Sequence, residues 1–154
     1  MISLSLYLIF LFFQPEKKVN VLYDQVNSSW VHYEDLIQHL GADPKAYFFC
    51  TEIEANCIYT NNEILDELAK DANTVRFTQI YFVDMAQLDI EILPSAIKSS
   101  LGFSHYPAFA MLSRSNKTIQ IHAVYEWSED AVFTPYGLKS WMMANGLWLE
   151  EYTN

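Results

Sequence analysis

Two spacings of hydrophobic residues take turns along this chain: the period of two that is typical of a strand and the period of about 3.6 that is typical of a helix. Residues 19–26 alternate with a period of two, which is typical of a half-buried strand. Residues 33–40 carry apolar side chains at helical spacing, and Gly41 follows at the position where helices commonly end. The next run, 46–51, is short and apolar, which favours a buried strand. The first third of the chain therefore predicts strand, helix and strand.

The same alternation continues to the C-terminus. The predicted elements are a helix at 55–72, a strand at 75–85, a short helix at 94–101, strands at 108–112 and 118–125, and a helix at 134–145. Strands separated by helices pair in parallel through right-handed crossovers, whereas the last two strands are joined by a short turn and must be antiparallel. The expected fold class is α/β, a β-α-β-α-β-α-β-β-α sandwich with a central mixed sheet.

The N-terminal segment raises a question of targeting. Residues 2–13 are uncharged and nearly all apolar, and residues 14–18 turn polar abruptly. A helix of this length spans about 18 Å, short of the ~30 Å hydrocarbon core, but it suits the apolar region of a signal peptide. No Lys or Arg precedes the run, and no small-x-small cleavage pattern follows it. We expect a signal peptide or hydrophobic anchor at 1–14 and one domain at 15–154; a buried element of the fold is the alternative.

Composition and charge narrow the function classes. A chain of 154 residues, 51% of them hydrophobic, suits one folded domain and excludes a disordered chain. Its net charge of −10 disfavours binding to nucleic acid or to anionic lipid through a basic patch. The four His residues lack metal-ligand spacing, and the acids Glu126, Glu129 and Asp130 read as a solvated loop. We therefore expect neither a metal nor a cofactor.

Two cysteines and two asparagines carry candidate chemistry. Cys50 and Cys57 leave three interpretations open: a small core residue at Cys50, a disulfide if the Cα atoms approach within about 7 Å, or a lone reactive thiol at Cys57. Asn27 and Asn116 each begin an N-glycosylation acceptor pattern in a predicted surface loop. Both acceptors would be used only in a secreted chain.

The order of elements, with a proline opening the strand after the third helix, resembles the thioredoxin fold over residues 19 to about 150. The motifs that carry this resemblance are KAYFF at 45–49, ILDELA at 64–69, YFVD at 81–84 and HYPAF at 105–109. Within the family the chain is most similar to redox-inactive members of the protein disulfide isomerase group, in particular the N-terminal domain of PDI-D type endoplasmic-reticulum chaperones. That closer similarity rests on YPAF at 106–109, LKSW at 138–141 and GLWL at 146–149.

The resemblance implies a degenerate redox motif. The residues at the motif's positions are Glu54, Ala55, Asn56 and Cys57. Glu54 replaces the attacking cysteine, and a carboxylate there would raise the pKa of a neighbouring thiol. The family's buried acid would fall near Phe48, which cannot titrate. Because dithiol exchange needs an attacking and a resolving thiol, no such enzyme activity is expected. Pro107 matches the family's cis-proline.

The expected function is a non-catalytic binding or escort module of the secretory pathway, in the endoplasmic-reticulum lumen or at its membrane. It would act on a protein partner or client through a surface around Tyr106, Pro107 and Trp148. One alternative is a structural accessory subunit of a membrane-associated complex, held through residues 2–13. Another is a redox protein that uses Cys57 as its single thiol. Oligomerisation stays open.

Overall fold

The computed structural model describes residues 30–51, 53–72, 80–86 and 94–148. Its strands are β1 (Trp30–His32), β2 (Lys45–Cys50), β3 (Ile80–Asp84), β4 (Ala108–Ser115) and β5 (Thr118–Glu126). Its helices are the 3-10 turn η1 (Tyr33–Asp35), α2 (Leu36–His39), α3 (Ala55–Tyr59), the π-helical η2 (Thr60–Leu65), α4 (Asp66–Asp71), α5 (Pro94–Leu101) and α6 (Pro135–Ala144). The segments α3, η2 and α4 run on without a break as one helix.

The five strands form one mixed sheet in the order β1-β3-β2-β4-β5. β1, β3 and β2 are parallel, β4 runs antiparallel to β2, and β5 runs antiparallel to β4. When η1 with α2, and α3 with η2 and α4, each count as one helix, the element order is the expected one. The fold class predicted from the sequence, a thioredoxin-like α/β sandwich with a central mixed sheet, is confirmed.

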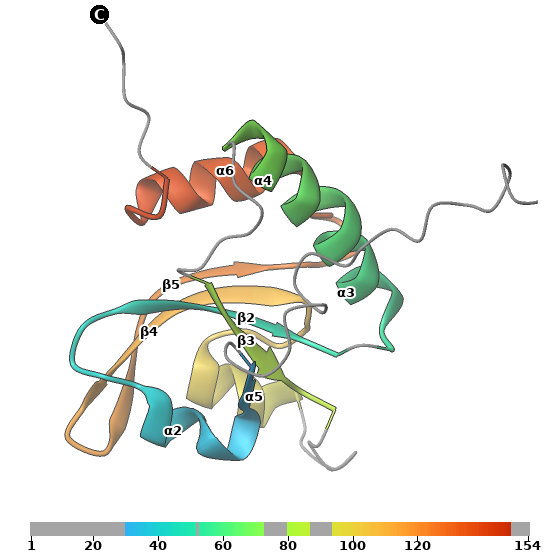
Figure 1. Ribbon diagram of the computed structural model, residues 1–154. Helices are drawn as coiled ribbons and strands as arrows, with labels where there is room; N and C mark the ends of the chain where they lie inside the picture. Colours follow the sequence, from blue (N-terminus) through green and yellow to red (C-terminus); the bar gives the residue numbers. More distant parts are fainter. Residues whose placement is uncertain (1–29, 52, 73–79, 87–93, 149–154) are drawn as a thin grey trace, which may run out of the picture.

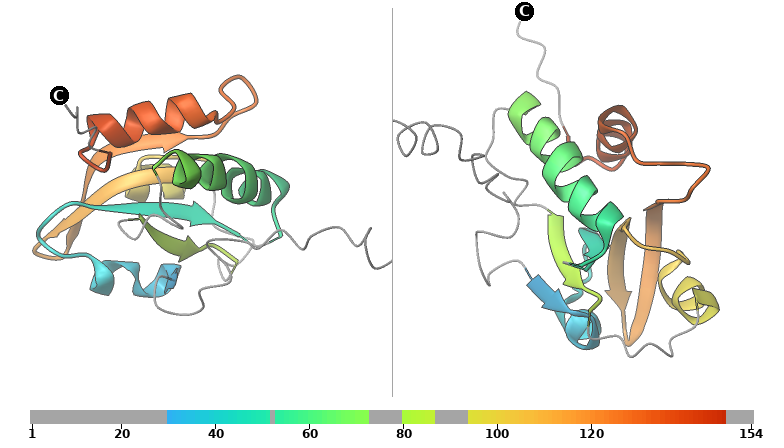
Figure 2. Two further views of the ribbon diagram at one scale, coloured as in Figure 1. Left: turned by 45° about the horizontal axis from the view of Figure 1, so that its top comes forward. Right: turned by 90° about the vertical axis from the view of Figure 1, so that its right-hand side faces the viewer.

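Helices cover both faces of this sheet (Figures 1 and 2). The long helix α3–α4 and α6 pack on one face, whose core contains Phe48, Phe82 and Phe109. α2 and α5 pack on the other face, against Tyr47 and Phe49 among others. Successive β2 side chains point to opposite faces, so an apolar run with helices on both sides is buried along almost its whole length. Burying one such ring contributes about 1.5–3 kcal/mol.

The sequence patterns correctly predicted where α5 and α6 end and where α6 begins. Gly102, after α5, and Gly146, after α6, both have positive φ, at 83° and 72°. Thr134 caps α6, where its hydroxyl oxygen accepts the Gly137 N–H at 3.0 Å and Pro135 stands at the first turn. These signals act within one helical turn, so they need no tertiary contact to be recognised.

The first described strand is one that the sequence pattern did not predict. The predicted strand at 19–26 and the predicted segment at 1–14 both lie outside the described residues. The described β1 is Trp30–His32, which pairs in parallel with β3 from Phe82 to Asp84. Three residues are too few for a period of two to be visible, which is why the pattern did not reveal this strand. No helix among the described residues is long and apolar enough to cross a membrane.

Candidate functional site at the start of α3

A disulfide joins the end of β2 to the first turn of α3. Cys50 is the last residue of the strand, and Cys57 lies in the helix, with a Cα–Cα distance of 5.6 Å. Both residues are completely buried. The Thr51 N–H also donates to Cys57 Sγ at 3.2 Å. Of the three interpretations that the sequence left open, the structure contains the bridge, so neither cysteine carries a free thiol in this state.

Glu54 occupies the N-cap of α3. Its Oε2 accepts the Cys57 N–H at 2.7 Å, and its Oε1 accepts an N–H from the Asn56 side chain at 3.0 Å. Short polar residues are the usual N-caps. Here the longer glutamate caps the helix, because its carboxylate accepts a backbone N–H that has no partner within the helix. The motif position where the resemblance expects an attacking thiol is therefore held by a bonded carboxylate.

Phe48 lies inside a stack of aromatic rings. Its ring centroid is 4.3 Å from that of Phe109 and 4.8 Å from that of Phe82, and all three side chains are buried. A titratable acid in this stack would carry a desolvation penalty with no polar partner among these rings. The place where the resemblance expects a proton-transferring acid is thus wholly apolar.

Pro107 lies beside Cys50 in the register of the adjacent strands β2 and β4. The Tyr106–Pro107 peptide bond is cis, as the resemblance implied. The ladder between β2 and β4 ends at the pair Phe49 and Ala108, so one further step in register places Pro107 opposite Cys50. The Trp127 N–H donates to the Pro107 carbonyl at 3.1 Å. The cis-proline, the bridge and the start of α3 therefore share one end of the sheet.

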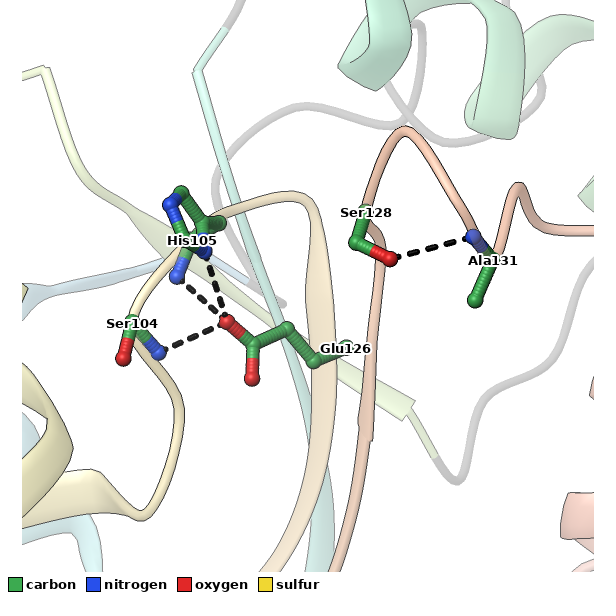
Figure 3. Close-up of polar contacts among 5 residues, drawn as sticks. All are labelled: Ser104, His105, Glu126, Ser128 and Ala131. Carbon is green, nitrogen blue, oxygen red and sulfur yellow. Dashed lines mark hydrogen bonds and ion pairs between the residues drawn. The ribbon is translucent and has the colours of Figure 1, made fainter.

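Glu126 anchors the loop that leads into this proline (Figure 3). Its Oε1 accepts the backbone N–H groups of Ser104 and His105, each at 2.8 Å, and lies 3.0 Å from His105 Nδ1. Partial burial on its own raises the pKa of Glu126, but the hydrogen bonds from Ser104 and His105 outweigh burial and lower the pKa below its ordinary value. One carboxylate oxygen thus fixes two consecutive backbone amides ahead of the cis bond.

Sequence reasoning missed this anchor. The pattern grouped Glu126 with Glu129 and Asp130 as a solvated loop, but Glu126 is the last residue of β5. Only Glu129 and Asp130 are exposed at the tip of the following turn, which a hydrogen bond from the Ala131 N–H to the Ser128 hydroxyl closes at 3.0 Å (Figure 3). The partners of Glu126 are 21 and 22 residues away along the chain, so no local pattern could have identified it.

Exposed apolar side chains flank the start of α3. Ile53 is 89% exposed, Tyr59 48% and Ile58 40%. Tyr106 is half-buried and packs against the core, and Phe103 is fully buried. Among the Tyr and Phe side chains at this end, Tyr59 is therefore the most open to solvent.

Trp148 lies elsewhere. Lys139 Nζ lies 4.4 Å from the centroid of its ring and also pairs with Asp71 at 2.7 Å, at the last residue of α4. The first residue of α3 and the last of α4 are on the order of 20 Å apart along one helix axis. The structure brings Tyr106 and Pro107 together beside the disulfide, and it sets Trp148 near the opposite end of that helix.

The remaining candidate residues are the asparagines of the acceptor patterns and the histidines. Asn116 is exposed in the turn between β4 and β5, with a φ of 57°, and Asn27 lies outside the described residues. Two of the histidines bond to hydroxyl groups: His39 Nδ1 lies 3.0 Å from the Tyr47 hydroxyl, and His122 Nε2 lies 2.8 Å from that of Ser113. Within the described ranges, no cluster of three or more His, Cys, Asp or Glu side chains is arranged to hold a metal.

The similarity of this chain to known proteins lies among solved structures. No protein-family model and no curated protein matches the chain. Among solved structures it is similar to a thioredoxin of Trichomonas vaginalis, with 14% identity over 77% of this chain and 99% of that one and a TM-score of 0.43. The fold class stated above rests on strand order, register and helix placement in the chain itself.

Proposed function

We propose that the chain is a non-catalytic thioredoxin-fold binding module of the secretory pathway that holds a protein partner or client. The observation that carries this proposal is Glu54, whose carboxylate accepts the Cys57 N–H at the N-cap of α3. Thiol exchange begins with attack by an accessible thiolate. Here the helix start bears a carboxylate, and both sulfur atoms are buried in one bridge.

The proposed contact surface, which we call the α3-end surface, consists of Ile53, Ile58, Tyr59 and Tyr106. Pro107, which the sequence placed on this surface, is buried behind Tyr106 in the chain and contributes through the shape of its cis bond rather than by contact. Three of the surface residues are exposed large apolar side chains. Apolar and aromatic anchors of this kind dominate the energetics of protein contacts. Glu126 fixes the loop that leads to Tyr106, because its carboxylate accepts the backbone N–H groups of Ser104 and His105. Trp148 stays a proposed partner residue, as a separate contact beside Lys139.

The secretory assignment has independent support from the bridge. Disulfides form and persist in oxidising compartments and are rare where thiols are kept reduced. The Cys50–Cys57 bridge fits such a compartment, as do the apolar segment at 2–13 and the acceptor patterns at Asn27 and Asn116. The same segment at 2–13 would hold the chain at the membrane in the alternative role of an accessory subunit.

A second candidate function is redox chemistry through Cys57. One observation favours it: Cys57 lies in the first turn of α3, where the helix dipole stabilises a thiolate. The bridge would first have to be reduced, and the released thiol would be a fully buried one. Insulin reduction separates this candidate from the binding module.

The test of the binding module is suppression of aggregation of thermally unfolded citrate synthase. We expect the protein to delay aggregation and the double variant Ile53→Ser/Tyr59→Ala to lose at least half of that effect. The matched control is Val132→Ser, because Val132 is also an exposed apolar residue but lies in the loop before α6. Equal protection by the parent and the double variant, or no protection by the parent, would contradict the proposed surface.

A further inference from the structure

The helices α4 and α6 run side by side over one face of the sheet (Figures 1 and 2). Between them lies a cleft of about 340 Å³ that no part of the proposed function uses. The residues that line it are Glu67, Leu68, Asp71, Pro135, Tyr136 and Lys139. Leu68 is buried and gives the cleft an apolar base, whereas Tyr136 is 82% exposed, the most exposed aromatic residue in the described chain.

Among the described residues, the basic side chains at this cleft already form ion pairs, whereas one of its acidic side chains does not. Lys139 Nζ pairs with Asp71 at 2.7 Å and lies over the Trp148 ring, so the cleft's own cation is already engaged. Lys70, the next cation on α4, pairs with Asp66 at 2.6 Å. Within the described ranges, the exposed carboxylate of Glu67 makes no hydrogen bond and no ion pair; it attracts Lys70 on the same helix, whose ammonium is bonded to Asp66. The cleft therefore offers an apolar base, an open aromatic ring and one unpaired negative charge.

We propose that this cleft binds an arginine side chain presented by a protein partner. The guanidinium stacks on the Tyr136 ring and pairs with the Glu67 carboxylate, and its methylene stem lies along Leu68 and Pro135. Arginine fits because its planar group stacks on aromatic rings and matches a carboxylate with two donors, whereas a lysine ammonium is more strongly hydrated and does neither as well.

The charge of the whole chain favours the same occupant. A net charge of −10 raises the local concentration of cationic segments and repels anionic ones. The cleft opens beside α4 and the first turn of α6, whereas the α3-end surface lies at the start of α3. The two contacts are thus separate, and either can fail without the other.

The test is a nuclear magnetic resonance titration of the isotopically labelled full chain with N-acetyl-arginine methylamide. The lysine analogue and the uncharged citrulline analogue serve as comparison probes. We expect saturable shifts centred on the amides of Glu67 and Tyr136, weaker binding of the lysine analogue, and no saturable shift with citrulline. Glu67→Gln should raise the dissociation constant about three- to fivefold, the effect of an exposed ion pair, and Tyr136→Leu should raise it about two- to fivefold, because the aliphatic residue lacks the ring quadrupole.

The matched control is Glu34→Gln, which removes the same charge from an exposed residue of η1, next to α2 and away from the cleft. It should leave the dissociation constant unchanged. Glu67 and Tyr136 are exposed, so their variants should keep the parent's melting temperature. Equal weakening by Glu34→Gln and Glu67→Gln would mean general charge attraction and overturn the proposal. So would shifts centred elsewhere, equal binding of arginine and lysine analogues, or no saturable shift.

Discussion

The carboxylate of Glu54 lies 2.7 Å from the backbone nitrogen of Cys57, so a side chain from the N-cap closes the first turn of α3. This contact joins the two residues that would have to be the attacking and resolving thiols of a redox motif. One of them is an acid that stabilises the helix, and the other is the buried end of a bridge to Cys50. In this chain, therefore, the carboxylate closes the first helical turn and the sulfur atom is held in a bridge.

The first prediction concerns the bridge. Replacing Cys50 and Cys57 together with Ala should lower the free energy of unfolding by about 2–3 kcal/mol, because the bridge closes a loop of eight residues in the unfolded chain. Urea unfolding measures the difference. The parent protein in excess reductant is the control and should unfold at the same urea concentration as the double variant. A loss below about 0.5 kcal/mol would show that the bridge contributes little to stability.

The second prediction concerns Glu126. Glu126→Gln should destabilise the fold by about 1–2 kcal/mol, because the bonds from Ser104 and His105 lose the charge on their acceptor. The lowered pKa of Glu126 sets the pH dependence of this difference. The stabilisation is fully present above the unfolded value of about 4.3 and is lost as pH falls through the lower folded value.

Unfolding of the parent and of Glu126→Gln should therefore be compared between pH 7 and pH 3. Their difference should stay constant down to about pH 5 and then shrink. Glu129→Gln, at the exposed turn beyond β5, is the control and should show no such dependence. A difference that grows on acidification would be inconsistent with a hydrogen-bonded carboxylate.

Much of the fold could be predicted because its signals are local. Thr134 with Pro135 marked the start of α6, and Gly146 marked its end. The hairpin between β4 and β5 could be predicted from an apolar run, a polar turn and an alternating strand, although β4 extends to Ser115 and the predicted turn is longer than the observed one. The parallel pairing of β2 with β3 followed from the helix between them.

The site was harder to predict, because its contacts are distant in sequence. Whether Cys50 reaches Cys57 depends on how the segment between β2 and α3 folds back, which spacing alone does not determine. The Asp71–Lys139 pair that borders the cleft spans 68 residues. This contact forms only when α4 packs against α6, so the sequence pattern of either helix alone cannot predict it.

The third prediction concerns Gly137, in the first turn of α6. A Cβ added there would collide with the Tyr125 hydroxyl, which is held by a ring stacked on Phe133 at 4.6 Å. Gly137→Ala should therefore destabilise the fold by about 1–3 kcal/mol, despite the better helix propensity of alanine. In the Tyr125→Phe background, which removes the colliding oxygen, the same substitution should cost much less. Equal costs in both backgrounds, measured by urea unfolding, would refute the collision.

The fourth prediction concerns glycosylation. Produced with a secretion signal in a eukaryotic cell, the chain should carry a glycan on Asn116, which is exposed in the hairpin turn. Thr118→Ala removes the acceptor pattern and leaves the Asn116 conformation, with its φ of 57°, unstrained. Endoglycosidase treatment followed by mass spectrometry should show a loss of mass in the parent at this site and none in the variant. An unmodified Asn116 in secreted parent protein would count against this site.

The central claim is that the fold is kept for binding and not for thiol exchange. Its most direct test is the turnover of insulin reduction by the protein in the presence of dithiothreitol, measured beside a C-x-x-C thioredoxin and dithiothreitol alone. The account predicts the rate of dithiothreitol alone, because Glu54 replaces the attacking thiol and the Cys50–Cys57 bridge is buried. Turnover comparable to that of the thioredoxin would contradict it.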